Sequence, residues 1–382
     1  MNHDRRIAPR ETAGLLLLAF AWLAATLWLR PLMLPDEGRY VGVAWEMLRS
    51  GHWLVPTLDG LPYFHKPPLF YWITAGSLSL FGVHEWAARA APFLGAAAAV
   101  SALYLFTLRW SGRAMARLAL LVLVTQPLLF AAAQFANLDM LVAGCISVTV
   151  LALASAALQL QEGRPARGAL LTGYAFAALG LLAKGLIGIV LPGMVIVAWL
   201  LAIRRPRLIL SLLSVPGLLL FLAIGAPWFV AMQQRFPEFA NYFFIVQHFK
   251  RYTTTGFNNP EPFWFYLLLV PLATLPWSGW LARRGSWRAP ERSPVRVLMW
   301  LWLALITLFF SLPKSKLVGY ILPVCVPVAW LIADAVAPAL ESGAARPRAW
   351  LRASVAAAGV LCLVSVTVAY LAPNKSLRDL GR

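Results

Sequence analysis

The chain has 382 residues, of which 60% are hydrophobic and only 13% are charged, and its formal net charge is +18. A soluble domain has about a quarter charged residues, so this composition excludes an ordinary soluble protein of two or three domains. The positive charge does not indicate a nucleic-acid partner, because the Lys and Arg residues lie between apolar runs rather than in one block. The sequence therefore predicts a protein embedded among membrane lipids.

Apolar runs of the length needed to cross a bilayer, roughly 20 residues, follow one another along the chain. We expect an all-α, polytopic transmembrane helix bundle of about eleven spans that forms a single domain, residues 1–382. The first run is expected to stay as a span rather than to be cleaved as a signal peptide. The expected spans are 12–34, 86–108, 118–133, 140–160, 168–183, 185–203, 208–232, 263–282, 297–312, 317–338 and 350–371. Cys145, Cys325 and Cys362 all lie in apolar runs and are expected to be packing residues.

The basic residues predict the orientation of these spans. With a cytoplasmic N-terminus, the inside segments hold 19 of the 33 Lys and Arg residues, all of them Arg, and the net charge is +13 inside against +5 outside. This agrees with the positive-inside rule, and an odd number of spans then leaves the C-terminus on the outer side of the membrane. The long outer loops are then 35–85 and 233–262, and we expect them to form the cap of a site.

The first outer loop contains the sequence Asp36-Glu37-Gly38-Arg39 directly after the first span. Residues 37–50 have apolar side chains at helical spacing and precede Gly51, which predicts an amphipathic helix along the membrane surface. Asp36 then has two interpretations. It is either the N-cap of this helix, or a general base that Glu37 and Arg39 help to place.

Further along the same loop, Lys66 is followed by two prolines and flanked by aromatic residues, with Tyr63 and His65 just before it. One interpretation is a snorkelling lysine in an aromatic belt, and the other is a cation held at headgroup depth for a phosphate. His65 and His248 would supply only half of the ligands of a metal site, and two histidines without fixed spacing are a weak signal. No metal and no other cofactor is therefore expected to be required.

Charged residues in other outer segments extend this pattern. Asp139 lies in a short turn at the edge of hydrocarbon, and Lys184 lies between apolar runs beside a glycine; intramembrane charges of this kind are functional candidates. Arg251, Lys314 and Lys316 also lie at the ends of spans on the outer side. Cations from separate segments on one side of the membrane predict a common anionic partner, such as a lipid phosphate or pyrophosphate.

These segments, in this order, resemble the GT-C superfamily of polyprenyl-phosphate-sugar-dependent glycosyltransferases, and within it the bacterial aminoarabinose transferases and their protein O-mannosyltransferase relatives. The resemblance covers about residues 30–325 and is most specific in the first outer loop. The segments that carry it are Asp36-Glu37-x-Arg39-Tyr40, Ser50-Gly51-x-Trp53-x-x-Pro56, Tyr63-x-x-Lys66-Pro67-Pro68-Leu69-x-Tyr71-Trp72, Gly82-x-x-Glu85-x-x-x-Arg89, Lys184-Gly185 and Lys314-x-Lys316-Leu317-x-x-Tyr320-x-Leu322-Pro323.

The resemblance implies roles for individual residues. Asp36 is implied to be the catalytic or acceptor-orienting carboxylate, with Arg39 placing it and Asp139 as the second outer-loop acid. Lys66, Lys184 and Arg251 are implied to hold the donor phosphate, with Tyr320 lining the same cavity. Glu37 joins the catalytic candidates, and the further cavity candidates are Tyr40, His65, Tyr63, His248, Lys314 and Lys316.

The implied function is transfer of a sugar, with anomeric inversion, from undecaprenyl phosphate to an acceptor on the periplasmic face, such as lipid A or another glycolipid. The family's further spans and C-terminal periplasmic domain have no counterpart in these 382 residues, so the acceptor stays open. One alternative is a protein O-mannosyltransferase-like enzyme. Another, of a different class, is a transporter or flippase for an anionic lipid, although transporters commonly show internal repeats and midplane charges that this sequence lacks.

Overall fold

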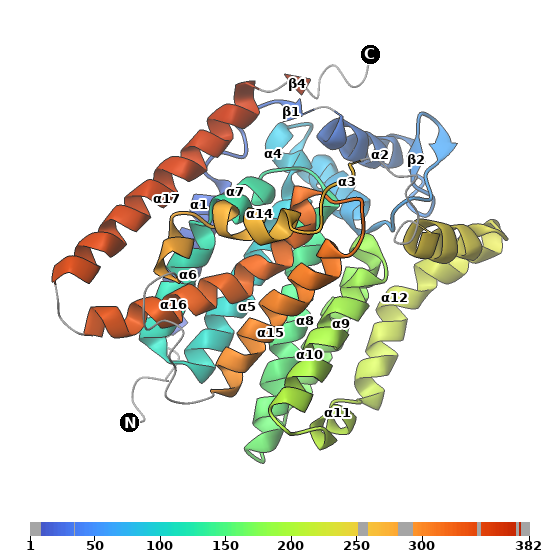
Figure 1. Ribbon diagram of the computed structural model, residues 1–382. Helices are drawn as coiled ribbons and strands as arrows, with labels where there is room; N and C mark the ends of the chain where they lie inside the picture. Colours follow the sequence, from blue (N-terminus) through green and yellow to red (C-terminus); the bar gives the residue numbers. More distant parts are fainter. Residues whose placement is uncertain are drawn as a thin grey trace.

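A computed structural model describes residues 9–33, 35–250, 259–281, 293–341, 345–371 and 374–375. The described residues confirm the expected all-α class (Figure 1). The helical elements are α1 (Pro9–Ala24), α2 (Asp36–Ser50), α3 (Leu69–Phe81), α4 (Glu85–Ala88), α5 (Ala90–Trp110), α6 (Arg113–Val124), α7 (Pro127–Ala133), α8 (Leu138–Gln161), α9 (Arg167–Lys184), α10 (Ile187–Ala202), α11 (Arg207–Ser211), α12 (Val215–Arg235), η1 (Asn241–Lys250), α14 (Phe265–Ala273), η2 (Trp277–Trp280), α15 (Pro294–Ser311), η3 (Val318–Val324), α16 (Cys325–Glu341) and α17 (Ala345–Leu371). Two short antiparallel strand pairs join β1 (Leu32–Met33) to β4 (Asn374–Lys375), and β2 (Thr57–Leu58) to β3 (Leu61–Pro62).

The long apolar helices make the protein a multi-pass membrane protein. In the described part of the chain, six helices are long and apolar enough to cross a bilayer: Ala90–Trp110, Leu138–Gln161, Val215–Arg235, Pro294–Ser311, Val318–Glu341 and Ala345–Val368. The bent pair α6–α7 makes a seventh if it is one span. Each of the eleven expected spans falls on a helical segment, but several of these segments are shorter than a bilayer, so the count of eleven stays a prediction.

Three expected spans are interrupted in the described residues, and one of them, 208–232, is divided between α11 and α12. The expected span 118–133 is bent by 65° between α6 and α7, where Pro127 starts the second helix. The expected span 263–282 is broken between α14 and the short 3-10 helix η2. Pro271 and Pro276 lie beside this break, and a proline inside a helix removes a backbone donor and clashes with the preceding turn.

The first expected span also ends early, because α1 stops at Ala24 rather than Leu34. The turns that follow point the carbonyl oxygens of Leu27, Arg30 and Pro31 at the guanidinium of Arg89, at 2.6, 3.0 and 2.9 Å. Carbonyls in a continuing helix would point along the helix axis to their own backbone partners. The helix is therefore unwound where the chain binds a buried cation.

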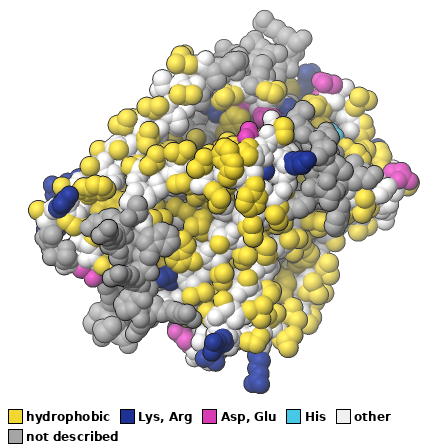
Figure 2. Space-filling view, viewed as in Figure 1, with side chains coloured by type: hydrophobic (Ala, Val, Ile, Leu, Met, Phe, Trp, Pro, Cys, Tyr) yellow, Lys and Arg dark blue, Asp and Glu magenta, His cyan; other side chains and the backbone are white. Residues whose placement is uncertain are grey.

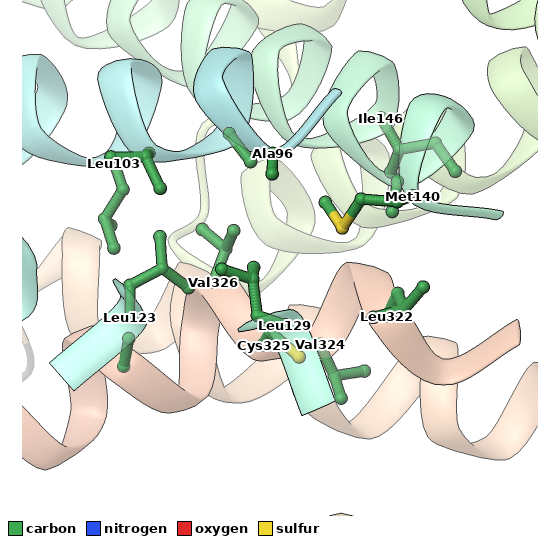
Figure 3. Close-up of a cluster of buried hydrophobic side chains, with 14 of the residues drawn as sticks. Ala96, Leu103, Leu123, Leu129, Met140, Ile146, Leu322, Val324, Cys325 and Val326 are labelled. Atoms are coloured by element: carbon green, nitrogen blue, oxygen red, sulfur yellow. The ribbon is translucent and has the colours of Figure 1, made fainter. Parts of the chain in front are cut away.

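In the described residues, the larger of two buried apolar clusters reaches from α1 to α17, and a smaller one joins the end of α9 to α12 and η1. Figure 3 shows part of it, where side chains of α5 and α8 meet those of α7, η3 and α16. The backbones of α5 and α8 approach most closely at Gly95 and Gly144, where an added Cβ on either residue would collide with the other helix. All three cysteines are buried and free, as expected of packing residues.

The two ends of the bundle differ in what they carry. In Figure 1, α2, α3 and the hairpin strand β2 lie at the upper end, whereas α11 lies at the lower end. Figure 2 shows hydrophobic side chains over much of this face, with Lys and Arg side chains at its lower tip. The elements of the first expected outer loop are thus gathered at one end.

Candidate active site

The expected amphipathic helix is present as α2, and Gly51 ends it with a left-handed φ of 70°. Asp36 is its first residue and does not act as an N-cap, because Pro35 holds that position and no side chain caps the helix. The carboxylate instead binds Arg39, with 2.5 Å between Oδ1 and Nη2. The Arg39 guanidinium also lies over the ring of Tyr40, 5.0 Å from its centroid. Asp36 and Arg39 are both partly exposed, so this pair is open to a ligand.

A second charged group lies where α8 begins, α9 ends and η3 begins. The Lys184 ammonium forms an ion pair with the Asp139 carboxylate, and both side chains are largely buried. The same ammonium lies over the ring of Tyr320, 4.3 Å from its centroid. Asn137 caps α8 by accepting a hydrogen bond from the backbone N–H of Asp139, at 2.7 Å, and its side-chain amide donates to Asp139 Oδ2 at 3.2 Å.

Gly319 brings η3 against this second group. A Cβ on Gly319 would meet Asp139 Oδ2 at well under the 3.0 Å that real Cβ atoms keep. Only a residue without a side chain allows the carboxylate to lie here, with the Lys184 ammonium on its other oxygen.

Tyr40 connects the two groups. Burial raises the pKa of the Tyr40 phenol, and the negative charge of Asp139 raises it further, against the opposing effect of Arg39. The phenol is therefore neutral at physiological pH, and it lies near enough to Asp139 and Asp36 for both charges to raise its pKa. The structure thus brings together Asp36, Arg39, Tyr40, Asp139, Lys184 and Tyr320, which come from four elements.

The segment before α3 lies beside these groups. The charges of Tyr40, Tyr63 and Asp36 together raise the pKa of Arg39, although burial alone lowers it, so Tyr63 lies near the same guanidinium. The Tyr63 ring packs edge-on against His65, 4.7 Å between centroids. Lys66 is half-buried and lies three residues before Leu69, the first residue of α3.

The first outer loop packs against the residues after α12. His65 stacks on Tyr242 of η1 at 6.0 Å, and Phe64 packs against Phe236 and Phe239 at 4.8 and 5.9 Å. The two long outer loops are thus in contact, while their role as a cap stays a prediction.

Glu37 has a different environment from its neighbour Asp36. It is fully buried, and its carboxylate binds the guanidiniums of Arg30 and Arg89 and the backbone N–H groups of Met33 and Ala136. Burial alone favours the neutral acid, but the two arginines outweigh it and lower the pKa of Glu37. An ionised, enclosed carboxylate of this kind has no access to a substrate.

Lys316 and Lys314 have different surroundings. Lys316 is buried, and its ammonium donates to the backbone oxygens of Glu261 and Pro313 at 2.8 and 2.5 Å. Burial lowers its pKa, while Glu261 acts in the opposite direction. Lys316 therefore joins the segment before α14 to the loop before η3, whereas Lys314 is exposed.

Two expected site residues fall outside the described part of the chain. Arg251 is not among the described residues, and neither is the side chain of His248. The expectations that Arg251 holds a phosphate and that no metal is required therefore stay predictions.

Sequence reasoning missed two residues and gave a third no role. Arg30 lies inside the first expected span, and a charge in an apolar run was a usable signal. Arg89 was part of the family resemblance, but without a function. Asn137 carried no signal, because its importance follows from the position at which α8 begins.

The fold and the site define a multi-pass membrane protein with a charged site at one end of its helix bundle. Residues 65–230 match the family described as dolichyl-phosphate-mannose-protein mannosyltransferase. The chain is 34% identical over 358 residues to an undecaprenyl phosphate-alpha-4-amino-4-deoxy-L-arabinose arabinosyl transferase of Aeromonas hydrophila, which covers 91% of this chain and 64% of that protein. The protein of the same name from Aeromonas salmonicida is 37% identical with the same coverage. The chain thus spans slightly less than two thirds of the length of these relatives. Over most of its length it is similar to these aminoarabinose transferases of the GT-C superfamily.

Solved structures show the same similarity. ArnT from Cupriavidus metallidurans, bound to undecaprenyl phosphate, matches with a TM-score of 0.77 and 33% identity over 87% of this chain and 61% of that one. The archaeal oligosaccharyltransferase AglB from Archaeoglobus fulgidus matches over 96% of this chain and 56% of that one with a TM-score of 0.58, but at 13% identity, which shows the fold alone.

Proposed function

We propose that the chain carries the donor half of an inverting glycosyltransferase in a bacterial inner membrane, and that it moves 4-amino-4-deoxy-L-arabinose from undecaprenyl phosphate to a lipid acceptor such as lipid A on the periplasmic face. The observation that carries the proposal is the connected group Asp36–Arg39–Tyr40 and Asp139–Lys184–Tyr320 at one end of the bundle. The sugar and the polyprenyl carrier come from the names of relatives that share this fold.

The chemistry of the reaction fits these residues. The leaving group is a polyprenyl phosphate, and charge grows on its oxygens as the bond to the sugar breaks. Fixed cations in a water-poor site stabilise such charge strongly, and we assign this role to Lys184 and Lys66, with Arg251 as a further candidate. We also assign to the Tyr40 phenol, which burial keeps protonated, a hydrogen bond donated to the same group.

Asp36 is assigned to the acceptor. A hydroxyl acceptor must lose a proton as it attacks, and a positioned base contributes roughly 10²–10⁴-fold to such a step. If the acceptor is a lipid phosphate, which is already ionised, Asp36 orients it instead. Asp36 is the better of the two adjacent acids, because its carboxylate is partly exposed while that of Glu37 is enclosed.

The test is sugar transfer by the purified protein from undecaprenyl phosphate-linked aminoarabinose to lipid A, read out by mass spectrometry. We expect transfer by the unaltered chain, and a loss of about 10²-fold or more in Asp36→Asn and in Lys66→Ala. The matched controls are Asp59→Asn, an exposed turn residue with a φ of 53° that Asn tolerates, and Arg207→Ala at the other end of the bundle. Full turnover in both site variants would refute the assigned roles, and background transfer by the unaltered, folded chain would refute the function.

Two other outcomes separate the alternatives. Transfer to a Ser- or Thr-containing peptide, with none to lipid A, would favour a protein O-glycosyltransferase, as the matched family's description suggests. Movement of the donor lipid across vesicles without any transfer would favour a flippase.

A further inference from the structure

The buried cluster around Glu37 joins three segments that are far apart in sequence. Glu37 lies in the first turn of α2, Arg89 directly precedes α5, and Arg30 lies in the turns after α1. Arg89 Nε is 3.0 Å from Glu37 Oε1, and the Arg30 guanidinium binds both Glu37 oxygens. One residue thereby fixes the start of α2 relative to the rest of the bundle.

The same cluster reaches the turn between α7 and α8. The backbone N–H of Ala136 donates to Glu37 Oε1 at 2.8 Å, and Arg30 donates to the backbone oxygen of Gln134 at 2.7 Å. Thr26 also binds the Gln134 side chain. This turn leads directly into α8, whose first residues include Asp139.

The cluster therefore lies between the two halves of the candidate site. Asp36 is adjacent to Glu37 and Tyr40 is one helical turn further, whereas Asp139 is three residues after Ala136. We propose that Glu37 is a positioning residue, which holds Asp36 and Tyr40 of α2 in register with Asp139 of α8 through Arg30, Arg89 and the Ala136 N–H. The proposal deepens the transfer function above and rests on it.

The burial of the cluster explains why it holds this register firmly. Glu37 and Arg89 are fully buried and Arg30 nearly so, and buried charges of this kind tolerate only partners with good geometry. The guanidinium is a planar fork with several donors, so both arginines fix the direction of the carboxylate as well as its distance. A small displacement of a reacting group costs up to about 10²-fold in rate, so such a frame is matched to what the site needs.

The experiment uses variants that keep every charge. Glu37→Asp shortens the side chain by one methylene group and keeps the carboxylate. Arg30→Lys keeps the positive charge and removes the planar guanidinium, while Glu37 is unchanged. The controls are Glu11→Asp and Arg117→Lys, because Glu11 also pairs with two arginines, Arg117 at 2.5 Å and Arg113 at 3.5 Å, near the start of α1. For each variant, kcat and the donor KM are measured with the assay above, together with the Kd for undecaprenyl phosphate and the thermal unfolding midpoint.

We expect Glu37→Asp and Arg30→Lys to lower kcat by about tenfold or more, while donor KM and the Kd for undecaprenyl phosphate change by less than about threefold. The control variants should keep kcat within about twofold. A loss of kcat that merely follows the fraction of folded protein, or no loss in either variant, overturns the proposal while leaving the transfer function intact.

If Glu37→Asp does not fold, Arg30→Lys decides by the same criteria. If neither folds while both controls do, the cluster serves folding and the positioning role is overturned. If the unaltered chain transfers no sugar but binds undecaprenyl phosphate, the transfer function is wrong, and the positioning proposal falls with it.

Discussion

At the scale of single residues, Gly319 carries a prediction that its sequence context did not suggest. A Cβ on this residue would collide with the Asp139 carboxylate, at the oxygen that does not bind Lys184. We expect Gly319→Ala to displace Asp139 and to lower kcat/KM for sugar transfer by about 10–100-fold. Gly76→Ala is the matched control, because nothing lies within 4 Å of its added Cβ. Equal turnover in both alanine variants would show that Asp139 does not have to lie where the structure places it.

Glu37 carries a second residue-scale prediction, on stability against pH. Its pKa in the folded protein is lower than the ordinary value of 4.5, so the ionised form is favoured by folding. The corresponding stability is fully present above pH 4.5 and is lost as the pH falls through the lower, folded pKa. We expect the midpoint of thermal unfolding to fall as the pH is lowered below 4.5.

The variant Glu37→Gln tests the source of that pH dependence. Removing the carboxylate leaves two buried arginines without a counter-charge, at a cost of roughly 3–5 kcal/mol. We therefore expect a lower midpoint at neutral pH and a flatter decline below pH 4.5 than in the unaltered chain. A decline of unchanged steepness would assign the acid sensitivity to other carboxylates.

At the scale of elements, the crossing of α5 and α8 depends on two glycines. An added Cβ on Gly144 would overlap the backbone of Gly95 on the neighbouring helix, and backbone atoms move less readily than side-chain ends. Forcing extra volume into a packed interior costs typically 1–3 kcal/mol. We expect Gly144→Ala to lower the thermal midpoint clearly, and Gly168→Ala, which meets nothing within 4 Å, to leave it near that of the unaltered chain. Equal midpoints for the two would mean that the helices separate at little cost.

Most helices could be predicted from apolar runs, because a bilayer demands long apolar segments whatever their tertiary contacts. The amphipathic helix α2 was also predictable, since its apolar spacing and Gly51 are both local signals. The interruptions within the helices were harder to predict from the sequence. The early end of α1 is set by Arg89, which lies 59 positions away from Arg30 in sequence, and no local pattern reports such a contact.

The candidate site divides in the same way. Charges at the ends of spans pointed to Asp36, Asp139 and Lys184, because an ionisable group at the edge of hydrocarbon needs a reason to be there. No local pattern indicated that Glu37 is enclosed while Asp36 is partly exposed. Lys316 was likewise indistinguishable from Lys314 until its backbone partners were known.

At the scale of the whole molecule, the charged residues report how the bundle lies in the membrane. The candidate site and the first outer loop lie at one end, and the arginine-bearing turns between α8 and α9 and before α11 lie at the other. Lys and Arg concentrate on the cytoplasmic side of membrane proteins, so the site is predicted to face the periplasm. Transfer of a polyprenyl-linked sugar to lipid A would take place on that side.

Cysteine labelling tests this orientation directly. The native cysteines Cys145, Cys325 and Cys362 are buried, so a membrane-impermeant maleimide should report only on introduced thiols. We expect His52→Cys, in the exposed part of the first outer loop, to be labelled in cells whose outer membrane alone is permeabilised. Arg164→Cys, exposed in the turn between α8 and α9, should be labelled only after the inner membrane is opened as well. The reverse pattern would place the candidate site on the cytoplasmic face of the inner membrane. The acceptor would then have to be a molecule accessible from the cytoplasm rather than a lipid in the periplasmic leaflet.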